Sequence, residues 1–312
     1  MASAIVYTEI GSPEVLHLID IPDPTPKPGE VVVRIEAAGV NPLDAKRRSG
    51  GRPTPPITEP RRVGFDGAGT ITEIGDGVTG FAVGDRVAIR NTVGTYATLL
   101  AVNVRDIAAL PDSVTAAEGA ALGIPAGTAY QVLKSLRVGE GDTLLVHAGS
   151  GAVGQAAIQF AVAWGARVIA TGSPARHEHL RELGAIPVAY GEGLTERVRE
   201  LGDVTVALDG IGTDEAINTS LALVDDHDRI ATIVRGPDAA DLGIRAFSGG
   251  SPVPLTDEEE AWRAEALPRT IDLIASGDFT VEIGAELPLS DAPRAHELIE
   301  SHAAGGKIVL IP

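Results

Sequence analysis

The fold is decided by the stretch Val146-His147-Ala148-Gly149-Ser150-Gly151-Ala152-Val153-Gly154. The apolar run just before it predicts a buried strand, and residues 155–164 have the apolar spacing of a helix packed on a sheet. The glycines match G-x-G-x-x-G between a strand and a helix, where they allow a tight turn and the close approach of a pyrophosphate. Free amides at the helix N-terminus suit phosphates. The stretch therefore predicts a dinucleotide site, and a glycine-rich turn that binds nothing is the alternative.

The end of the next predicted strand indicates which nicotinamide cofactor binds. NAD-binding versions of this arrangement have an acidic residue about 20 residues beyond the glycines. Here Gly172-Ser173-Pro174 stands at that place, with no Asp or Glu before Glu178. Ser173 can donate a hydrogen bond and Arg176 can bind a phosphate with two N–H groups, so NADPH is expected. In the alternative interpretation Ser173 only caps a helix and Arg176 is solvated.

Composition and charge exclude several classes of function. The 312 residues include 25 Lys and Arg against 43 Asp and Glu, a net charge of −18. Such a surface repels nucleic acid and anionic lipid, so neither is an expected partner. The chain has no cysteine, which excludes disulfides, thiolate metal sites and cysteine nucleophiles. Without a signal sequence or an apolar run of membrane-spanning length, we expect a cytoplasmic protein.

The first third of the chain predicts a barrel-like β domain, because short β segments alternate with Pro and Gly. The expected strands are 5–7, 15–19, 31–38, 70–74, 86–89 and 96–102, and the helices that follow are 113–122 and 128–136.

From Thr143 onward strands alternate with helices, which predicts a parallel sheet covered on both faces. The strands after the glycine loop are 167–170, 186–189, 204–208 and 229–234, and the helices between them are 174–183, 194–201 and 214–223. Residues 237–254 lack periodicity and predict a loop between domains. Thr256 and Glu259 form a capping-box pattern for a helix to about residue 276. A strand at 286–289, a helix at 292–302 and a strand at 307–311 end the chain.

Several motifs, in this order, resemble those of the zinc-free, zeta-crystallin-like quinone oxidoreductases of the medium-chain dehydrogenase/reductase superfamily. They are Pro28-Gly29-Glu30-Val31, Ala38-Gly39-Val40-Asn41-Pro42-Leu43-Asp44, Gly64-Phe65-Asp66-Gly67-Ala68-Gly69, Val83-Gly84-Asp85-Arg86-Val87, Pro125-Ala126-Gly127-Thr128-Ala129-Tyr130, the glycine loop, and residues 305–312. The resemblance covers the whole chain. It implies an α/β protein with a GroES-like β-rich domain from both chain ends (1–117 and 258–312) and a Rossmann doubly wound parallel-sheet domain (118–257), with the active site in the cleft.

The resemblance also implies the residues that bind NADPH. Together with the motif residues Gly149, Ser150 and Gly154, they are Asn41, Thr128, Gly151, Ala152, Val153, Gly172, Ser173, Arg176, Tyr190, Phe247 and Lys307. For Tyr190, an ordinary aromatic at a strand end is an equal alternative. The family further implies a homodimer that pairs the Rossmann sheets edge to edge near Arg229–Val234.

The resemblance also bears on zinc and on catalysis, because this sequence differs from zinc-dependent relatives at the ligand positions and from many family members at one further residue. Zinc-dependent relatives have cysteine where Asn41 stands and a His-Glu pair where Phe65-Asp66 stands, so no metal is expected. The tyrosine that many relatives carry five residues after the asparagine is Lys46 here. Asn41 and Lys46 are the predicted catalytic residues, because a lysine can donate a proton or hold an oxyanion. Alternatively, Lys46 is a surface cation paired with Asp44 or Asp66.

The function predicted from these features is NADPH-dependent, zinc-independent hydride transfer to a quinone or an α,β-unsaturated carbonyl compound. A 2-enoyl thioester reductase is the alternative of the same class, favoured by a group of arginines: Arg47, Arg48, Arg52, Arg61 and Arg62. A non-catalytic NADPH-binding structural or regulatory protein is the alternative of another class. The sequence leaves the physiological substrate open.

Overall fold

The computed structural model describes residues 1–52, 54–247 and 253–312. They form two compact units, one comprising Met1–Ile124 with Leu267–Pro312 and the other Pro125–Ala266. Two helices run from one unit into the other, α3 (Gly123–Ser135) and α9 (Asp257–Ser276). The domain boundaries expected at 117/118 and 257/258 stay predictions. No helix in the described ranges is long and apolar enough to span a bilayer.

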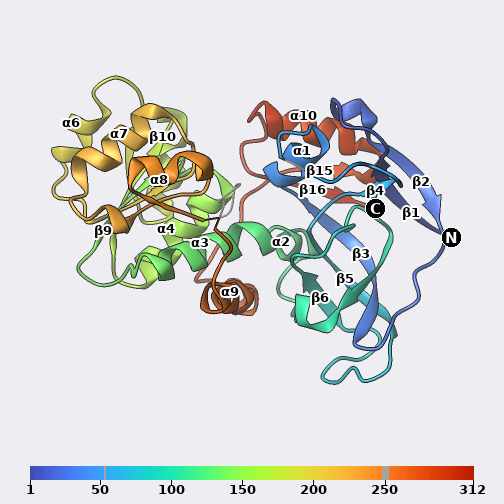
Figure 1. Ribbon diagram of the computed structural model, residues 1–312. Helices are drawn as coiled ribbons and strands as arrows, with labels where there is room; N and C mark the ends of the chain where they lie inside the picture. The colour runs from blue at the N-terminus through green and yellow to red at the C-terminus, as the bar shows by residue number, and fades with distance from the viewer. Residues whose placement is uncertain (53, 248–252) are drawn as a thin grey trace. The chain divides into compact units, whose positions relative to one another are not determined.

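The first unit is built on two β-sheets (Figure 1). The smaller has the order β2-β1-β4, and the larger the order β15-β16-β3-β5-β6-β8, with β7 also paired to β3. Their bounds are β1 Ala2–Tyr7, β2 His17–Ile21, β3 Glu30–Val40, β4 Arg61–Arg62, β5 Asp66–Ile74, β6 Arg86–Ile89, β7 Leu99–Asn103, β8 Ile107–Ala109, β15 Ile283–Pro288 and β16 Lys307–Ile311. Buried aliphatic residues of β3 and β16 share one core with those of β5 and β6. Three helices belong wholly to this unit: α1 Pro42–Arg48, α2 Ala116–Ala120 and α10 Ala292–Glu300.

The C-terminal strand lies beside the longest strand of this sheet. β16 pairs antiparallel with β3, with Ile308 opposite Val40 and Leu310 opposite Ala38. Lys307 begins β16 and Asn41 follows the end of β3, so the register brings the two residues to the same place. The two ends of the chain therefore form one domain, as expected.

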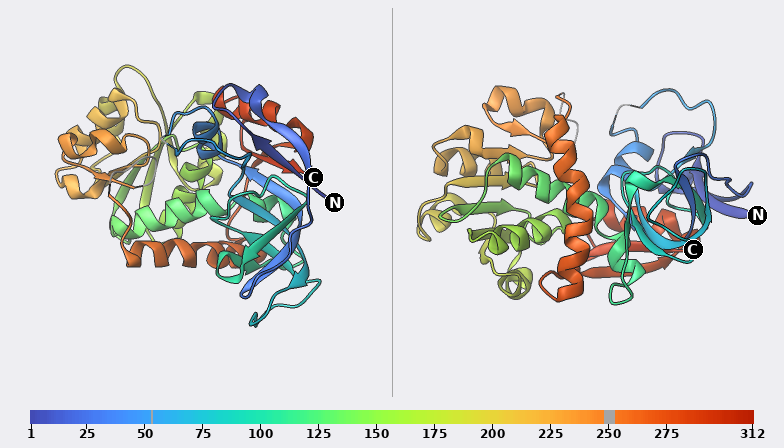
Figure 2. Two further views of the ribbon diagram at one scale, coloured as in Figure 1. Left: turned by 45° about the vertical axis from the view of Figure 1, so that its right-hand side comes forward. Right: turned by 90° about the horizontal axis from the view of Figure 1, so that it is seen from below.

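The second unit is an all-parallel sheet of the order β11-β10-β9-β12-β13-β14. Counted along the chain this is 3-2-1-4-5-6, the doubly wound order in which ligands bind beyond the carboxyl ends of the strands. The strands are β9 Thr143–His147, β10 Arg167–Gly172, β11 Ile186–Ala189, β12 Val206–Asp209, β13 Ile230–Thr232 and β14 Arg245–Ala246. Helices flank both faces (Figure 2): α4 Ala152–Ala163, α5 His177–Glu182, α6 Leu194–Arg199, α7 Asp214–Leu223 and α8 Ala239–Leu242.

The structure corrects several expectations about short elements. The strands β4 and β8 and the helix α1 were not predicted, and residues 237–247 contain α8 and β14 rather than an unbroken loop. Such elements are too short to show a period. β13 lies between β12 and β14, so 229–234 holds an inner strand; the edge strands of this sheet in the described ranges are β11 and β14, and the homodimer stays a prediction. Part of that predicted loop, 248–252, lies outside the described residues.

Candidate functional site

A buried polar group of side chains, here called the Asn41 cluster, lies in the first unit. Its six members come from five separate segments and are at most 5% exposed: Asn41, Asp44, Asp66, Tyr96, His296 and Lys307. Buried polar groups are costly unless they are hydrogen-bonded, so their bonds define the site.

Asn41 and Lys307 form the centre of this cluster. Nζ of Lys307 donates to Oδ1 of Asn41 at 2.5 Å, and Nδ2 of Asn41 donates to Oδ2 of Asp66 at 2.9 Å. Nζ of Lys307 lies 3.8 Å from the same carboxylate oxygen, which also accepts the N–H of Ile124 at 3.0 Å. The amide of Asn41 is therefore held at both its oxygen and its nitrogen. The structure brings together two predicted cofactor-binding residues that are far apart in sequence.

Asp44 forms the second half of the cluster. Its Oδ2 accepts the backbone N–H of Asn41 at 2.8 Å and the hydroxyl of Tyr96 at 3.3 Å. The hydroxyl of Tyr96 is also 3.5 Å from Nε2 of His296. Among the described residues, Oδ1 of Asp44 and Oδ1 of Asp66 have no hydrogen-bond partner although both are buried.

Two buried carboxylates share one ammonium here, and burial raises the pKa of both carboxyl groups. Burial, followed by the nearby Asp66, raises the pKa of Asp44 to about 7. Burial also raises the pKa of Asp66 and lowers that of Lys307, while each of these two charges partly stabilises the other. The pKa of Asp44 therefore lies near neutrality, so its carboxyl group is the member of the cluster whose charge should change in that range.

The residues at this position do not fit a zinc ion. Zinc sites are made of thiolate, imidazole and carboxylate ligands, and this sequence has no cysteine. Within the described ranges no three His, Asp or Glu side chains are grouped as a metal site. In addition, the ammonium of Lys307 lies beside Asn41 and Asp66, where it would repel a divalent cation.

Lys46, the other predicted catalytic residue, is exposed on α1. In the described part of the chain Lys46 forms no ion pair, and Oδ2 of Asp44 and Oδ2 of Asp66 are hydrogen-bonded to other groups. The alternative that Lys46 pairs with Asp44 or Asp66 is therefore wrong. Its catalytic role stays a prediction.

The glycine loop in the second unit has the geometry of a phosphate cradle. Gly151 is the N-cap of α4 and has no side chain with which to cap it, so the first N–H groups of that helix point outward without an intrahelical acceptor. A Cβ added to Gly151 would meet only the carbonyl oxygen of Ala148, at 3.4 Å, so the space over this residue is open. A Cβ on Gly154 would lie 2.3 Å from the same oxygen, so that glycine serves close packing. The strained turn residue is Ala148, with φ of 62°, rather than a glycine.

The carboxyl end of β10 lies against this loop. The N–H of Gly149 donates to the carbonyl oxygen of Thr171 at 2.9 Å, and the N–H of Ala148 to its hydroxyl at 3.1 Å. Ser173 then occupies the N-cap of a short 3₁₀ turn, Pro174–Arg176, but its hydroxyl makes no capping bond. The hydroxyl remains available for another acceptor. The structure thus brings the predicted residues of the glycine loop together with Gly172 and Ser173.

The other predicted cofactor residues are placed individually. Tyr190 follows β11 and is 62% exposed. Thr128 is buried on α3, and Phe247 is buried after β14, where the guanidinium of Arg245 lies 4.7 Å from its ring centroid. Asn41 and Lys307 belong to the first unit and these residues to the second. Their roles toward the cofactor remain predictions.

Sequence reasoning missed several buried polar residues. At the carboxyl end of β12, Asp209 accepts the N–H groups of Ile211 and Gly212 and the hydroxyl of Thr232. Tyr96 and His296 were missed because 200 residues separate them, and no local pattern joins them. Asp44 had a usable signal, since an acidic residue three positions after Asn41 has capping-box spacing.

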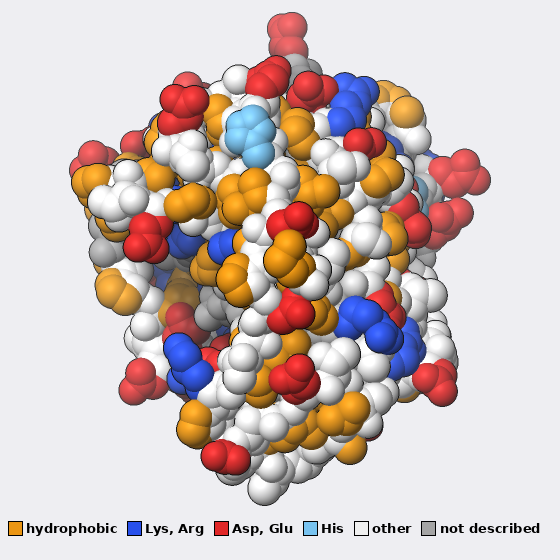
Figure 3. Space-filling view, turned by 90° about the vertical axis from the view of Figure 1, so that its right-hand side faces the viewer, with side chains coloured by type: hydrophobic (Ala, Val, Ile, Leu, Met, Phe, Trp, Pro, Cys, Tyr) orange, Lys and Arg blue, Asp and Glu red, His pale blue; other side chains and the backbone are white. Residues whose placement is uncertain are grey.

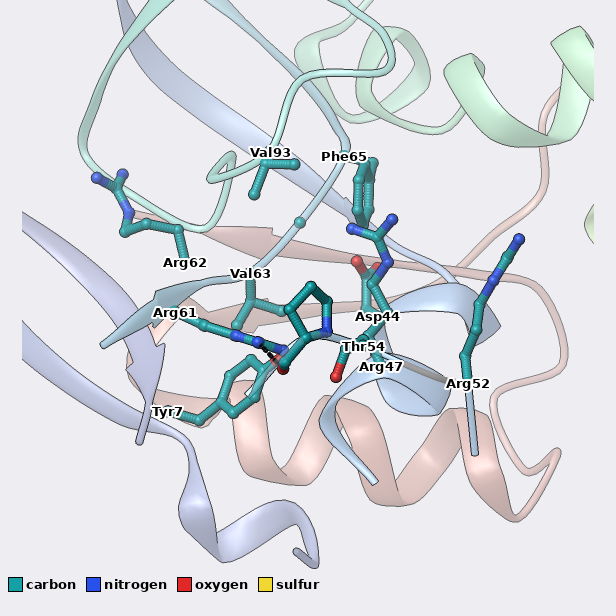
Figure 4. A pocket seen from close by; sticks show the side chains of 12 residues that line it. Tyr7, Asp44, Arg47, Arg52, Thr54, Arg61, Arg62, Val63, Phe65 and Val93 are labelled. Atoms are coloured by element: carbon teal, nitrogen blue, oxygen red, sulfur yellow. Dashed lines mark hydrogen bonds between the residues drawn. The ribbon is translucent and has the colours of Figure 1, made fainter. Parts of the chain in front are cut away.

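A pocket of about 480 Å³ in the first unit, here called the arginine pocket, adjoins Asp44 (Figure 4). The lining residues with ionisable acidic or basic side chains are Arg47, Arg52, Arg61, Arg62 and Asp44. The other lining residues are Tyr7, Thr54, Pro55, Val63, Gly64, Phe65 and Val93. Of the five arginines grouped from sequence, Arg48 is not among them. It is 1% exposed and donates to the carbonyl oxygen of Gly11 and to the carboxylate of Glu300.

Known proteins match the chain along its full length. Residues 27–134 match the alcohol dehydrogenase GroES-like domain family, and residues 183–310 the zinc-binding dehydrogenase family. A quinone oxidoreductase of Salmonella typhimurium is 33% identical over 335 residues, covering 100% of both chains. That of Homo sapiens is 32% identical over 331 residues, covering 99% of this chain and 97% of the human one.

A solved structure adds the fold to this likeness. The Escherichia coli quinone oxidoreductase complexed with NADPH is 28% identical with a TM-score of 0.84, over 99% of this chain and 100% of that one. With the GroES-like match and the six-stranded parallel sheet, the predicted α/β fold of a GroES-like domain and a Rossmann domain is confirmed.

Proposed function

The chain belongs to the quinone oxidoreductases of the medium-chain dehydrogenase/reductase superfamily, an enzyme family, and on that premise we propose that it is a zinc-independent, NADPH-dependent reductase of quinones or α,β-unsaturated carbonyl compounds. The open surface of Gly151 at the N-terminus of α4 carries this proposal, because it is the place in the second unit that a pyrophosphate can approach.

NADPH is the proposed cofactor because the residues present fit it. The pyrophosphate is held by the loop Gly149–Gly154 and the first N–H groups of α4, and the 2′-phosphate by Ser173 and Arg176. Two observations support this choice over NADH. The hydroxyl of Ser173 makes no capping hydrogen bond to the 3₁₀ turn, and the segment Gly172–Arg176 has no carboxylate. When bound, NADPH supplies the hydride.

Asn41 and Lys46 are the proposed groups of the chain that act on the acceptor. The amide of Asn41 is oriented by Lys307 and Asp66, so it presents a fixed dipole. Lys46 is exposed on the following helix, where an ammonium can donate a proton to the reduced acceptor or hold its oxyanion. Lys307 acts as a positioning residue through Asn41.

The reductase proposal is tested by NADPH oxidation, followed at 340 nm, with a series of quinones and simple enones. We expect turnover with at least one acceptor, in the presence of a chelator as well as without it. Crotonyl-CoA is the comparison, because the arginine pocket favours a 2-enoyl thioester as the second candidate substrate. Faster reduction of crotonyl-CoA than of any quinone would support that second candidate, and tight NADPH binding without any turnover would contradict both.

We also propose that the protein is a homodimer. β14 is an edge strand of the parallel sheet, and an edge strand has unpaired N–H and C=O groups that a second chain can engage. The neighbouring strand β13, which contains Thr232, is an inner strand and offers no such edge. Light scattering on the protein eluted from a size-exclusion column gives its mass in solution. A monomer at micromolar concentration would contradict this assignment.

A further inference from the structure

The arginine pocket concentrates positive charge in an acidic protein. Four of its lining residues are arginines, while the whole chain has a net charge of −18. On the face shown in Figure 3, Asp and Glu side chains are scattered widely over the surface. Among the lining residues the single carboxylate is Asp44, whose pKa is raised to about 7 by burial. One partly protonated carboxyl group cannot neutralise four guanidinium groups.

In the part of the chain that the structure describes, the four guanidinium groups are not paired with other carboxylates. Among the described residues, Arg47, Arg52, Arg61 and Arg62 form no salt bridge, unlike the neighbouring Arg48. Arg61 donates to the carbonyl oxygens of Pro55 and Pro56, and Arg62 to that of Gly94, all of them uncharged acceptors. The buried Nε of Arg62 has no acceptor among these residues.

The arginines are also close enough to repel one another. Burial lowers the pKa of Arg47, and the next largest cause is the charge of Arg52, with Arg61 acting in the same direction. Like charges gathered in a half-buried pocket destabilise the empty protein. An anion in the pocket would remove that repulsion and accept charge-assisted hydrogen bonds.

Several of the remaining lining residues are apolar. Phe65, Val63 and Val93 are apolar, and the guanidinium of Arg47 lies 4.5 Å from the ring centroid of Phe65. Figure 4 shows these side chains in the lining of the pocket. The pocket also connects with the Asn41 cluster, because its lining residue Asp44 accepts the N–H of Asn41. A molecule that carries both an apolar ring and a negative group therefore fits the chemistry of the lining.

We propose that the arginine pocket binds the acceptor through an anionic group, so that the substrate is a planar quinone or enone carrying a carboxylate, sulfonate or phosphate. This inference rests on the proposed function, since the carbonyl chemistry comes from there. The pocket adds the selection for charge. Arg47, Arg52 and Arg61 are its specificity-determining residues.

The test compares two acceptors in wild type and variants. The values of kcat/KM are measured for 1,2-naphthoquinone-4-sulfonate and for 1,2-naphthoquinone, and their ratio is followed in Arg52→Gln, Arg61→Gln and Arg34→Gln. Arg34 is exposed on β3 and does not line the pocket, so it is the matched control. We expect each pocket variant to lower the ratio about tenfold, as for the loss of one charged hydrogen bond, and the control to leave it unchanged. High salt should lower the wild-type ratio in the same direction.

A binding measurement separates this inference from the proposed function. Calorimetry with 2-naphthoate, 1-naphthyl phosphate and adenosine 3′,5′-bisphosphate, each with saturating NADP⁺ present, needs no turnover. Binding of the naphthyl anions that Arg52→Glu abolishes supports the pocket even if no quinone is reduced. Reduction of neutral quinones with a ratio that no pocket variant changes overturns the inference and leaves the proposed function intact. Arginine-dependent binding of the bisphosphate alone also overturns it, in favour of a coenzyme A thioester.

Discussion

Nζ of Lys307 donates a hydrogen bond of 2.5 Å to Oδ1 of Asn41, across 266 residues of sequence. The pairing of β16 with β3 brings the two side chains together, so the last strand of the chain completes the buried site around Asn41. Asn41, Lys307 and Asp66 form one hydrogen-bonded unit, and the orientation of the amide depends on all of it.

Replacing Lys307 should therefore affect stability through Asp66. Lys307→Met leaves that buried carboxylate without its ammonium, and breaking a buried pair in this way costs about 3–5 kcal/mol. We expect urea unfolding at pH 7 to show such a loss, and Lys307→Met/Asp66→Asn to recover most of it. A single variant as stable as wild type would contradict the ion pair, and no recovery in the double variant would show that Lys307 acts through packing alone.

Asp44 should make stability depend on pH near neutrality. Its pKa is about 7 in the folded protein against about 3.9 in an unfolded chain, so the folded state binds more protons between these values. The contribution of Asp44 is fully present below pH 4 and is lost as pH rises through 7, by up to about 1.4 kcal/mol per pH unit.

The Asp44→Asn variant isolates this effect. His147 and His296, whose pKa values burial lowers to about 4 and about 3, change stability in the opposite direction between pH 4 and 6.5 in both proteins. The free energy of unfolding of wild type minus that of Asp44→Asn should therefore fall from pH 4 to pH 7. A difference that stays constant over this range would show that Asp44 is ionised in the folded state.

The second and third glycines of the motif should respond differently to substitution by alanine. Gly151→Ala meets only the oxygen of Ala148 at 3.4 Å and has an ordinary extended backbone, so we expect normal stability with NADPH binding weakened at least tenfold. Gly154→Ala puts a Cβ 2.3 Å from that oxygen, and overpacking of this kind costs about 1–3 kcal/mol. Thermal unfolding and fluorescence titration check both. Unchanged NADPH affinity in Gly151→Ala would move the pyrophosphate away from α4.

How much of this site the sequence predicts depends on the range of the pattern. The glycine loop is local, so its strand, turn and helix were predicted and α4 begins within the quoted stretch. The contact of Lys307 with Asn41 depends on the pairing of β16 with β3, which no spacing encodes; only the resemblance to a family indicated both residues. The same holds for the arginine pocket, where the grouping of charges in sequence included Arg48 although its guanidinium is buried and binds the carboxylate of Glu300.

Cofactor preference should depend on Ser173 and Arg176. If they hold the 2′-phosphate, Arg176→Ala should weaken NADPH binding about tenfold or more and leave NADH binding unchanged, since a hydrogen bond to a charged group contributes about 1.5–3 kcal/mol. Ser173→Ala should have a smaller effect in the same direction. Fluorescence titration with both nucleotides measures the preference, with Arg167→Ala, exposed at the start of β10, as the control. Equal losses for NADPH and NADH would assign Arg176 to the fold instead.

Lys46 offers the sharpest test of the proposed chemistry, because it is exposed and its replacement should not disturb folding. If its ammonium donates the proton or holds the oxyanion, Lys46→Met should lower kcat at least tenfold with little change in KM, because the lost interaction is made in the transition state. Lys46→Arg should keep part of the activity, and Lys27→Met, at another exposed lysine of the same unit, should keep all of it.

Lys46→Tyr adds an outcome that a merely structural residue would not produce. A tyrosine supplies a phenolic proton donor where many members of the family have one, so it should restore the turnover that Lys46→Met loses. Full activity in Lys46→Met would remove Lys46 from the mechanism. The oriented amide of Asn41 would then be left as the proposed group of this chain that stabilises the reduced acceptor.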